Sequence, residues 1–398
     1  MLPRIVYGKA TVGIKVGVYE RLGITPIINA AGDLTKFGGR LMSERVMTAM
    51  SEASAASVVL DELQAAAGKR ISQITHSEAA YVVPGAAAGL ALAAASCMIA
   101  KNMTFAEQLP RPPDGVADQI LIYRSHLTRY ARMLEVTGAK VRVVEGLDEA
   151  RTVIAEGSVA AFCFLHSGKD VPALFETTIE LASQSGIPVI VDAAVSLPPL
   201  GNLSRYCDAG ADLVVFSGGK AIGGPQASGF ICGRSDLVTT VAKLHLGPGP
   251  FAIGRPMKVG KEEIVGLLEA IEEYLSRPHE SELLAWSKSM ERLSKSLTTL
   301  PGVKVTVEKS LPNGRPLACV VLKFGAEPSR APVLAKMLLE GSPRIALDSS
   351  RESSGVLLIY PANLRPGEDE IVAEAIKRCW IKIDFDEAAE KTVGGSRI

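Results

Sequence analysis

The 398-residue sequence predicts an α/β protein with a mainly parallel sheet, followed by a smaller α+β domain. Two observations lead to this fold class. Short β-rich runs alternate with helical patterns through the first two thirds of the chain, which implies crossover connections between parallel strands. These runs are almost continuously apolar, as expected for strands that helices cover on both faces.

The predicted elements of the large domain alternate along the chain. An alanine-rich helix over residues 86–100 follows the first strand, apolar side chains have helical spacing over 127–134, and another helix is predicted over 174–183. The predicted strands cover residues 81–84, 119–123, 140–144, 159–165, 187–191, 213–216 and 230–232. Ligands bind such sheets at the carboxyl ends of their parallel strands, so residues that follow these strands are the first candidates for a site.

The pattern changes after Pro256. Long helical patterns cover residues 258–274 and 280–297, and shorter patterns then alternate. Strands are predicted over 303–307, 318–323, 345–347 and 356–359, and helices over 332–339 and from residue 368. This pattern of helices and strands predicts a separate α+β domain, with a boundary between residues 256 and 280.

Composition and charge argue against several classes of protein. Lys and Arg together number 43, as do Asp and Glu, so the net charge near zero argues against a polyanion as the main partner. The six cysteines form no CxxC pair, which predicts thiols of a reducing compartment rather than disulfides or a zinc site. The longest apolar run, residues 86–100, is too short to span a bilayer, and the first residues lack the apolar core of a signal peptide. We therefore expect a cytoplasmic protein.

The stretch FSGGKAIGGPQASG, residues 216–229, places one lysine among glycine pairs directly after an apolar run. A lysine in a loop is most often solvated, and Lys220 taken alone would be interpreted that way. The glycines favour another interpretation, because glycine permits positive φ angles and lets the backbone approach a bulky ligand. A lysine amine held away from water can form a Schiff base, and the hydroxyl of Ser217 is placed to donate to a phosphate.

Asp192 ends the run IPVIVD, at the carboxyl end of a predicted parallel strand. The competing interpretation is a helix N-cap, for which aspartate is equally suited. Pyridoxal phosphate needs such a carboxylate, since an acid beside its ring nitrogen keeps that nitrogen protonated. Together, Lys220 and Asp192 point to a pyridoxal-phosphate site.

Small residues at a helix start and one histidine extend this set. The sequence PGAAAG, residues 84–89, joins a strand to a helix, where free backbone N–H groups and the positive end of the helix dipole can hold a phosphate. Tight packing of the helix on the sheet would favour the same small residues, and the motif is neither GxGxxG nor a P-loop. His126 follows another strand, where its ring can stack on a cofactor, although a histidine in a loop is more often structural.

The order of these motifs resembles that of fold-type-I pyridoxal-phosphate enzymes: Gly85-Ala86-Ala87, His126, Asp192, then Ser217-x-x-Lys220. The GGPQ after the lysine, INAAGDLTKFGGR over residues 28–40 and GRPMKVGKEE over residues 254–263 resemble the selenocysteine synthase (seryl-tRNA selenium transferase) superfamily. Within it, GGKAIGGPQ and the glycine pair before Arg40 are most similar to the D-glucosaminate-6-phosphate ammonia-lyase type. The resemblance extends from about residue 28 to 263 and is weaker beyond.

The resemblance implies a fold, a cofactor and roles for residues. The fold would be aspartate aminotransferase-like, with a mainly parallel seven-stranded sheet. The chain would divide into an N-terminal segment contributing to the active site (1–40), a large domain that binds pyridoxal phosphate (41–265) and a small α+β domain (266–398). Lys220 would hold the cofactor as a Schiff base and Asp192 its ring-nitrogen proton, in a homodimer or larger homo-oligomer without a metal. The other cofactor-binding residues would be Gly85, Ala86, Ala87, His126, Ser217 and Gly224, and the substrate carboxylate would bind Arg40 and Arg255.

The same resemblance implies a lyase. It would catalyse α,β-elimination of a small β-hydroxy amino acid or amino-sugar acid to a 2-oxo acid and ammonia. A selenocysteine synthase-like transferase on seryl-tRNA, a pyridoxal-phosphate aldolase or racemase, and a non-catalytic regulator stay open, although the zero net charge argues against an RNA partner. Asp33 departs from the family pattern, which has a small or hydroxyl residue there, so a side chain pointing into the site would indicate a different substrate.

Overall fold

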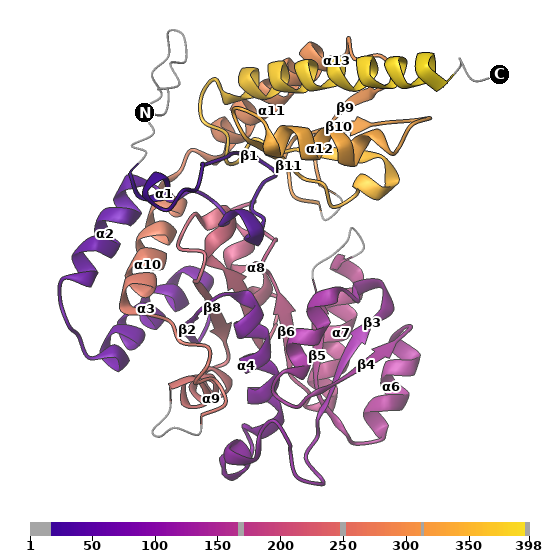
Figure 1. Ribbon diagram of the computed structural model, residues 1–398. Coiled ribbons are helices and arrows are strands. Elements are labelled where there is room, and N and C mark those ends of the chain that lie inside the picture. The colour runs from indigo at the N-terminus through magenta and orange to yellow at the C-terminus, as the bar shows by residue number, and fades with distance from the viewer. Residues whose placement is uncertain (1–16, 166–170, 247–251, 312–313, 395–398) are drawn as a thin grey trace.

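The computed structural model describes residues 17–165, 171–246, 252–311 and 314–394 (Figure 1). Figure 1 shows a large domain below and a smaller domain above it. Strands β1 (Ile28–Ala30) and β11 (Ile345–Leu347) lie between them. The two domains have separate hydrophobic cores.

A seven-stranded sheet forms the centre of the large domain. Its strand order is β2-β8-β7-β6-β5-β3-β4, and every neighbouring pair is parallel except the two made by β8. The prediction of a mainly parallel seven-stranded sheet is therefore confirmed. The strands are β2 (Ala79–Val83), β3 (Gln119–Tyr123), β4 (Lys140–Val144), β5 (Val159–Leu165), β6 (Val189–Asp192), β7 (Leu213–Ser217) and β8 (Gly229–Gly233).

Helices cover both faces of this sheet, which explains why its inner strands are mainly apolar, whereas the edge strand β4 has exposed Lys140 and Arg142. In β3, Ile120 and Ile122 pack into one core layer and Leu121 and Tyr123 into the other, because side chains alternate along a strand. One layer contains α4 (Ala86–Ile99), α5 (Arg132–Glu135) and α9 (Ser235–Leu246). The opposite layer contains α2 (Glu44–Ser54), α3 (Leu60–Thr75), α6 (Leu147–Ala155), α7 (Val171–Ser185), α8 (Asn202–Asp208) and α10 (Lys261–Ser276).

The alanine-rich helix α4 lies directly against the sheet. A side-chain carbon at Gly89 would stand 2.6 Å from Cγ1 of Val215 on β7, so the helix lies this close only because residue 89 is glycine. Tight packing, the competing interpretation of the small residues, therefore explains Gly89. Among the described helices, none has the length and apolar character needed to cross a membrane.

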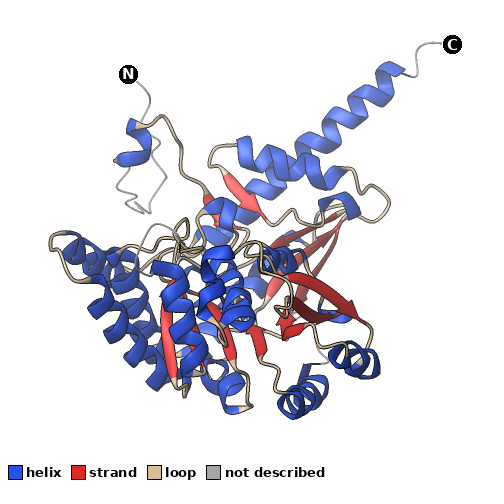
Figure 2. Cartoon of the chain, turned by 90° about the horizontal axis from the view of Figure 1, so that it is seen from below, coloured by secondary structure: helices blue, strands red, loops and turns tan. Residues whose placement is uncertain are grey.

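The small domain packs helices on a three-stranded antiparallel sheet of order β12-β10-β9. Its core includes Phe324 and Trp380. The elements are β9 (Lys304–Glu308), β10 (Cys319–Lys323), β12 (Val356–Ile359), α11 (His279–Leu297), α12 (Arg330–Glu340) and α13 (Glu368–Gly394). Figure 2 shows the end of α13 projecting away from the rest of the chain. The six cysteines are free thiols and three of them are buried, as the sequence predicts.

The N-terminal segment and α10 connect the two domains. Strand β1 pairs in parallel with β11, so residues 28–30 are part of the small domain. The predicted boundary between residues 265 and 266 falls within α10, whose Ile264 and Ile271 side chains belong to the core of the large domain. We therefore place the start of the small domain at α11.

Candidate active site

Residues from four separate strands of the large domain meet at one edge of its sheet. Strands β2, β3, β6 and β7 run in the same direction, so their carboxyl ends lie together. Gly85 follows β2, His126 follows β3, Asp192 ends β6, and Lys220 follows Ser217 at the end of β7. The topology thus brings together residues that lie far apart in the sequence.

Lys220 lies in the loop between β7 and β8, residues 218–228, here called the lysine loop. The glycines around Lys220 let this loop fold back on itself. Residues 218–222 form one π-helical turn, in which Lys220 has non-helical backbone angles. The N–H of Gly218 donates to the carbonyl oxygen of Ser228 at 2.9 Å, and a side-chain carbon at Gly218 would stand only 2.2 Å from Oγ of Ser228. Packing within the loop therefore requires glycine here, in addition to any room that a ligand needs.

Lys220 carries a partly buried amine near several charged groups. Burial lowers the pKa of Lys220, the carboxylates of Asp192 and Asp33 raise it in part, and the guanidinium of Arg315 lowers it. Because the net shift is downward, more of this amine is neutral at neutral pH than in a solvated lysine. The neutral amine is the form that reacts with an aldehyde and accepts a proton.

The carboxylate of Asp192 lies within electrostatic reach of the amine of Lys220, and it also accepts a hydrogen bond that closes the turn after β6. Its Oδ1 atom accepts a hydrogen bond from the N–H of Ala194 at 2.9 Å. Burial raises the pKa of Asp192, while that hydrogen bond and the charge of Lys220 lower it in part. The side chain of Asp192 therefore caps a turn and not a helix, which was the competing interpretation of this residue. This hydrogen bond does not exclude a role for Asp192 beside Lys220.

The start of α4 offers a place for a phosphate. Gly85 precedes the helix with φ of 121°, a conformation that favours glycine. A side-chain carbon at Gly229, the first residue of β8, would stand 3.1 Å from the Gly85 backbone, so the two segments lie close together. Among the described residues no side chain caps α4, so the N–H groups near Ala86 and Ala87 remain available to an anion.

Three more residues that the sequence predicts to bind the cofactor lie at the same edge of the sheet, and they differ in burial and in their contacts. Ser217 is half-buried at the end of β7. Gly224 lies in the lysine loop, where its N–H already donates to the carbonyl oxygen of Gly218 at 2.9 Å. His126 is buried with its ring edge-on to that of Phe164, at a centroid distance of 5.1 Å. Their roles toward the cofactor stay predictions.

The N-terminal segment closes over the lysine loop. The N–H of Arg40 donates to the carbonyl oxygen of Gly219 at 3.0 Å. Gly39 has φ of 73°, and a side-chain carbon there would stand 2.6 Å from the same oxygen. The segment predicted to contribute to the active site thus contacts the loop through its backbone, and the Gly38-Gly39 pair makes that approach possible.

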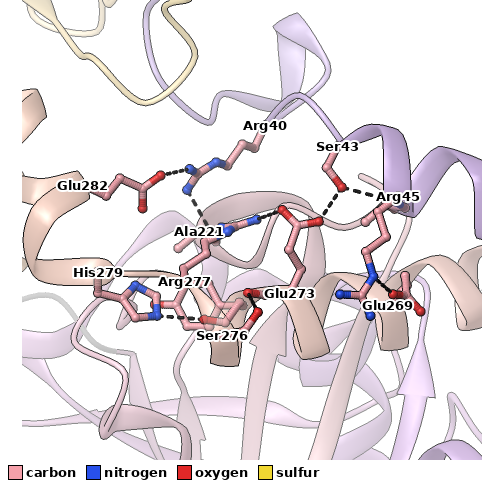
Figure 3. A network of polar contacts seen from close by, with 12 residues as sticks. Arg40, Ser43, Arg45, Ala221, Glu269, Glu273, Ser276, Arg277, His279 and Glu282 are labelled. Carbon is pink, nitrogen blue, oxygen red and sulfur yellow. Dashed lines mark hydrogen bonds and ion pairs between the residues drawn. The ribbon is translucent and has the colours of Figure 1, made fainter.

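Arg40 and Arg277 both hold the carbonyl group of Ala221, the residue after the site lysine (Figure 3). Each donates from Nη1 to the Ala221 oxygen at 3.1 Å. Arg40 also forms an ion pair with Glu282 of α11 at 3.2 Å. The guanidinium predicted to bind the substrate carboxylate is therefore engaged by the protein itself, and its role toward a substrate stays a prediction.

We expect Arg40→Ala to lose stability even without a substrate. The side chain is mostly buried, and besides the contacts above it lies over the ring of Trp286, 5.3 Å from its centroid. Charge-assisted hydrogen bonds contribute about 1.5–3 kcal/mol, so the free energy of unfolding should fall by about 2 kcal/mol. Denaturant unfolding of the cofactor-free protein measures this change.

Arg45→Ala is the matched control, because its ion pair with Glu269 is more exposed. Surface pairs contribute at most about 1 kcal/mol, so this variant should differ little from the wild type. An unchanged unfolding free energy for Arg40→Ala, combined with a raised KM for the substrate, would instead support direct binding of the substrate carboxylate by Arg40.

Two residues that sequence reasoning did not single out also lie at the site. Arg315 is 8% exposed, and its charge lowers the pKa of Lys220. Tyr274 on α10 is buried, and its hydroxyl has no hydrogen-bond partner among the described residues. Burial raises the pKa of Tyr274 to about 12, so the hydroxyl stays protonated and can donate. By contrast Arg255, the other predicted carboxylate ligand, is exposed on the segment after α9, and its role stays a prediction.

These residues fit pyridoxal phosphate. A partly buried amine with a lowered pKa suits the aldehyde, and a carboxylate at a strand end suits the ring nitrogen. The uncapped start of α4 and the hydroxyl of Ser217 suit the phosphate. The three chemical parts of the cofactor thus each have a matching group at one edge of the sheet.

Comparison with known proteins gives relatives that cover most of the chain. The family model described as L-seryl-tRNA selenium transferase matches residues 175–302. A 5'-C-glycyluridine monooxygenase-decarboxylase from Streptomyces sp. is 34% identical over 372 residues, which cover 89% of this chain and 90% of that protein. A D-glucosaminate-6-phosphate ammonia lyase from Salmonella typhimurium is 27% identical over 303 residues, which cover 73% and 78% of the two chains.

A solved structure of a D-glucosaminate-6-phosphate ammonia-lyase has the same fold. The TM-score is 0.74, and the match covers 92% of this chain and 98% of that chain. The sequence identity in this match is 24%, so the likeness is one of fold. It confirms the predicted fold type I with a mostly parallel central sheet.

Proposed function

The chain belongs to the selenocysteine synthase-like family of fold-type-I pyridoxal-phosphate enzymes, and from that membership we propose that it is a lyase for an amino acid with an oxygen substituent on its β-carbon. One observation carries the proposal. The partly buried amine of Lys220, whose pKa is lowered by burial, lies within electrostatic reach of the carboxylate of Asp192, at the edge of the sheet where ligands bind. The reaction and the substrate are the proposed parts.

Pyridoxal phosphate, when bound, withdraws electrons from the bonds at the α-carbon of an amine substrate. The residues of this chain supply the rest. Lys220 would hold the cofactor and then take the α-proton, because the lowered pKa of its amine favours the neutral form that accepts a proton. Asp192 would keep the proton on the ring nitrogen, and its hydrogen bond from Ala194 fixes the carboxylate in place.

We assign the substrate carboxylate to Arg315. Its guanidinium is buried and acts on the charge state of Lys220. A guanidinium stays charged in a protein and matches a carboxylate with two parallel hydrogen bonds. The hydroxyl of Tyr274, which is close enough to influence Arg315, can add a further donor. Arg40 and Arg255 are second choices, because no charge of theirs acts on the amine of Lys220 as that of Arg315 does, and Arg255 is exposed.

The proposed reaction is an α,β-elimination. The α-proton and the β-hydroxyl leave together as water, and the resulting unsaturated amine rearranges and takes up water. The net products are a 2-oxo acid and ammonia. The names of the relatives support this class of substrate, because serine and glucosaminate both have an amine on C2 and an oxygen on C3.

The relative that is 34% identical favours a second function. Its name joins a monooxygenase to a decarboxylase, a reaction that consumes dioxygen and releases carbon dioxide. The same lysine and aspartate would serve such a reaction, with the bond from the α-carbon to the carboxylate broken in place of the bond to hydrogen. The gases consumed and released therefore distinguish the two functions.

We expect the cofactor-loaded protein to release ammonia and a 2-oxo acid in equal amounts from at least one 2-amino-3-hydroxy acid. The substrates to test are L- and D-serine, L- and D-threonine, D-glucosaminate and D-glucosaminate 6-phosphate. Coupled assays measure both products, and an oxygen electrode records whether dioxygen is consumed.

Release of carbon dioxide with uptake of dioxygen would support the second function. If no substrate releases ammonia and a 2-oxo acid, although the protein shows the visible absorption of bound cofactor, the proposed elimination is contradicted. Binding of seryl-tRNA that weakens steeply with salt would favour the transferase.

We also propose a homodimer or larger homo-oligomer in the cytoplasm. Arg255 is exposed on its own chain, and enzymes of this fold build each site from two chains, so the segment over residues 254–263 would reach a partner's site. The free thiols are those of a reducing compartment.

A further inference from the structure

Asp33 lies in a fixed turn at the start of the segment that closes over the lysine loop. Asn363 of the small domain donates from Nδ2 to the carbonyl oxygens of Gly32 and Gly39, both at 3.1 Å. The Oδ1 atom of Asn363 accepts a hydrogen bond from the N–H of Leu41, also at 3.1 Å. The backbone is thus tied on both sides of Asp33, which limits where its side chain can point.

The carboxylate of Asp33 includes one buried oxygen. Its Oδ1 atom has no hydrogen-bond partner among the described residues. A buried carboxylate oxygen without a donor costs free energy, because it loses water and gains no hydrogen bond in return. Such an atom is expected where a ligand supplies the donor.

The carboxylate of Asp33 lies within electrostatic reach of the amine of Lys220 and of the guanidinium of Arg315. Burial lowers the pKa of both groups, and the charge of Asp33 offsets that lowering in part. Tyr274, with its buried hydroxyl, also acts on Arg315. An acceptor and a cation from distant parts of the sequence therefore lie within electrostatic reach of the amine of Lys220, and the hydroxyl of Tyr274 lies within reach of the cation.

We propose that Asp33 is a specificity-determining residue whose carboxylate accepts a hydrogen bond from a hydroxyl or amino group on the substrate side chain. The inference rests on the proposed function, in which an amino acid binds beside Lys220. An ionised carboxylate only accepts hydrogen bonds, so it favours substrates with an O–H or N–H group beyond the α-carbon. Analogues without that group leave the carboxylate unpaired and are rejected. The expected family residue, small or with a hydroxyl, would lack this charge.

Pairs of amino acids that differ by one donor group test the proposal. The pairs are serine and alanine, threonine and 2-aminobutyrate, and 2,3-diaminopropionate and alanine, each as both enantiomers. The spectral change of the bound cofactor gives an apparent dissociation constant for each amino acid. In the wild type, the donor-bearing member of at least one pair should bind about tenfold to a hundredfold more tightly. Asp33→Ala should reduce that preference to about twofold or less, and Asp33→Asn to an intermediate value.

Asp118→Asn is the matched control. Asp118 is a buried carboxylate just before β3, at the opposite edge of the sheet, and pairs with Lys140 at 2.7 Å. This variant should keep the wild-type preference. Thermal unfolding of each variant separates a change of specificity from a loss of folding, and Asp33→Asn keeps the volume of the side chain if Asp33→Ala proves unstable.

The proposal is wrong if the wild type shows no preference within any pair, including failure to bind either member. It is also wrong if the Asp33 variants keep the wild-type preference. Failure of the proposed cofactor site would be recognised independently of any amino acid, because the visible absorption of bound cofactor would not form in the wild type or would survive in Lys220→Ala. Failure of the proposed elimination would be recognised by the absence of ammonia release from a wild type that shows this absorption.

Discussion

Replacement of Lys220 by alanine should abolish the visible absorption of protein-bound cofactor and lower the turnover rate by at least about ten-thousandfold. The physical reason is that one amine is assigned two tasks, to hold the cofactor and to move the α-proton. Its position, partly buried and near two carboxylates, is set by the loop after β7. Absorption spectra after addition of the cofactor and the rate of ammonia release measure the two losses.

A chemical readout identifies the lysine directly. Reduction of the loaded wild type with borohydride should fix the cofactor on the peptide that contains Lys220, as peptide mass spectrometry would show. The rate of attachment should rise with pH and level off at a lower pH than for a solvated lysine, because burial lowers the pKa of Lys220. Lys243→Ala, which removes an exposed lysine of α9, is the control. Attachment to any other lysine would overturn the assignment.

Much of the large domain could be predicted because its strands are local features of the sequence. The strands predicted over residues 119–123, 140–144 and 159–165 agree with β3, β4 and β5 at both ends. The helical segment expected over residues 127–134 begins two residues late, as a 3-10 turn over Arg129–Ala131 that continues into α5. Leu127 and Tyr130 are 42% and 57% exposed, so the apolar spacing there marks no buried stripe, whereas Leu134 is buried.

Pairing between distant segments could not be predicted in the same way. Strand β1 has three residues, and its partner β11 lies near the other end of the chain. A run this short carries no periodic pattern that identifies a partner. The place of residues 28–30 in the small domain, and of the whole of α10 in the large one, therefore became visible only in the structure.

The same distinction applies to the site. That Lys220 and Asp192 lie at the same edge of the sheet could be predicted, because Asp192 ends one strand, Lys220 follows another, and parallel strands bring their carboxyl ends together. Arg315 could not, because two of the residues whose charges act on it, Asp33 and Arg40, lie far away in the sequence. Asp33 was noticed as a departure from a family pattern, but the sequence gives no direction for its side chain.

Replacement of Asp192 by asparagine should lower kcat/KM by about a hundredfold to a thousandfold. Asparagine keeps an oxygen that can accept the hydrogen bond from Ala194, so the turn after β6 should persist. What is lost is the negative charge that would keep the ring nitrogen of the cofactor protonated. The ammonia-release rate measures the effect, and Asp118→Asn should leave it unchanged. A near-normal rate in Asp192→Asn would contradict the assigned role.

Asp192→Asn should lower the activity of the loaded enzyme but raise the thermal stability of the cofactor-free protein. Burial raises the pKa of Asp192, so its ionised form is less favourable in the folded chain than in the unfolded chain. A carboxyl group with a raised folded pKa stabilises the fold below its unfolded pKa, and this stability is lost as the pH rises through the folded pKa. At neutral pH, cofactor-free Asp192→Asn should therefore unfold at a higher temperature than the wild type. Bound cofactor should then stabilise the wild type more than the variant. Only the wild type has the Asp192 carboxylate, whose negative charge would pair with the protonated ring nitrogen of the cofactor. A lower unfolding temperature for the variant in both states would mean that Asp192 serves the fold rather than the cofactor.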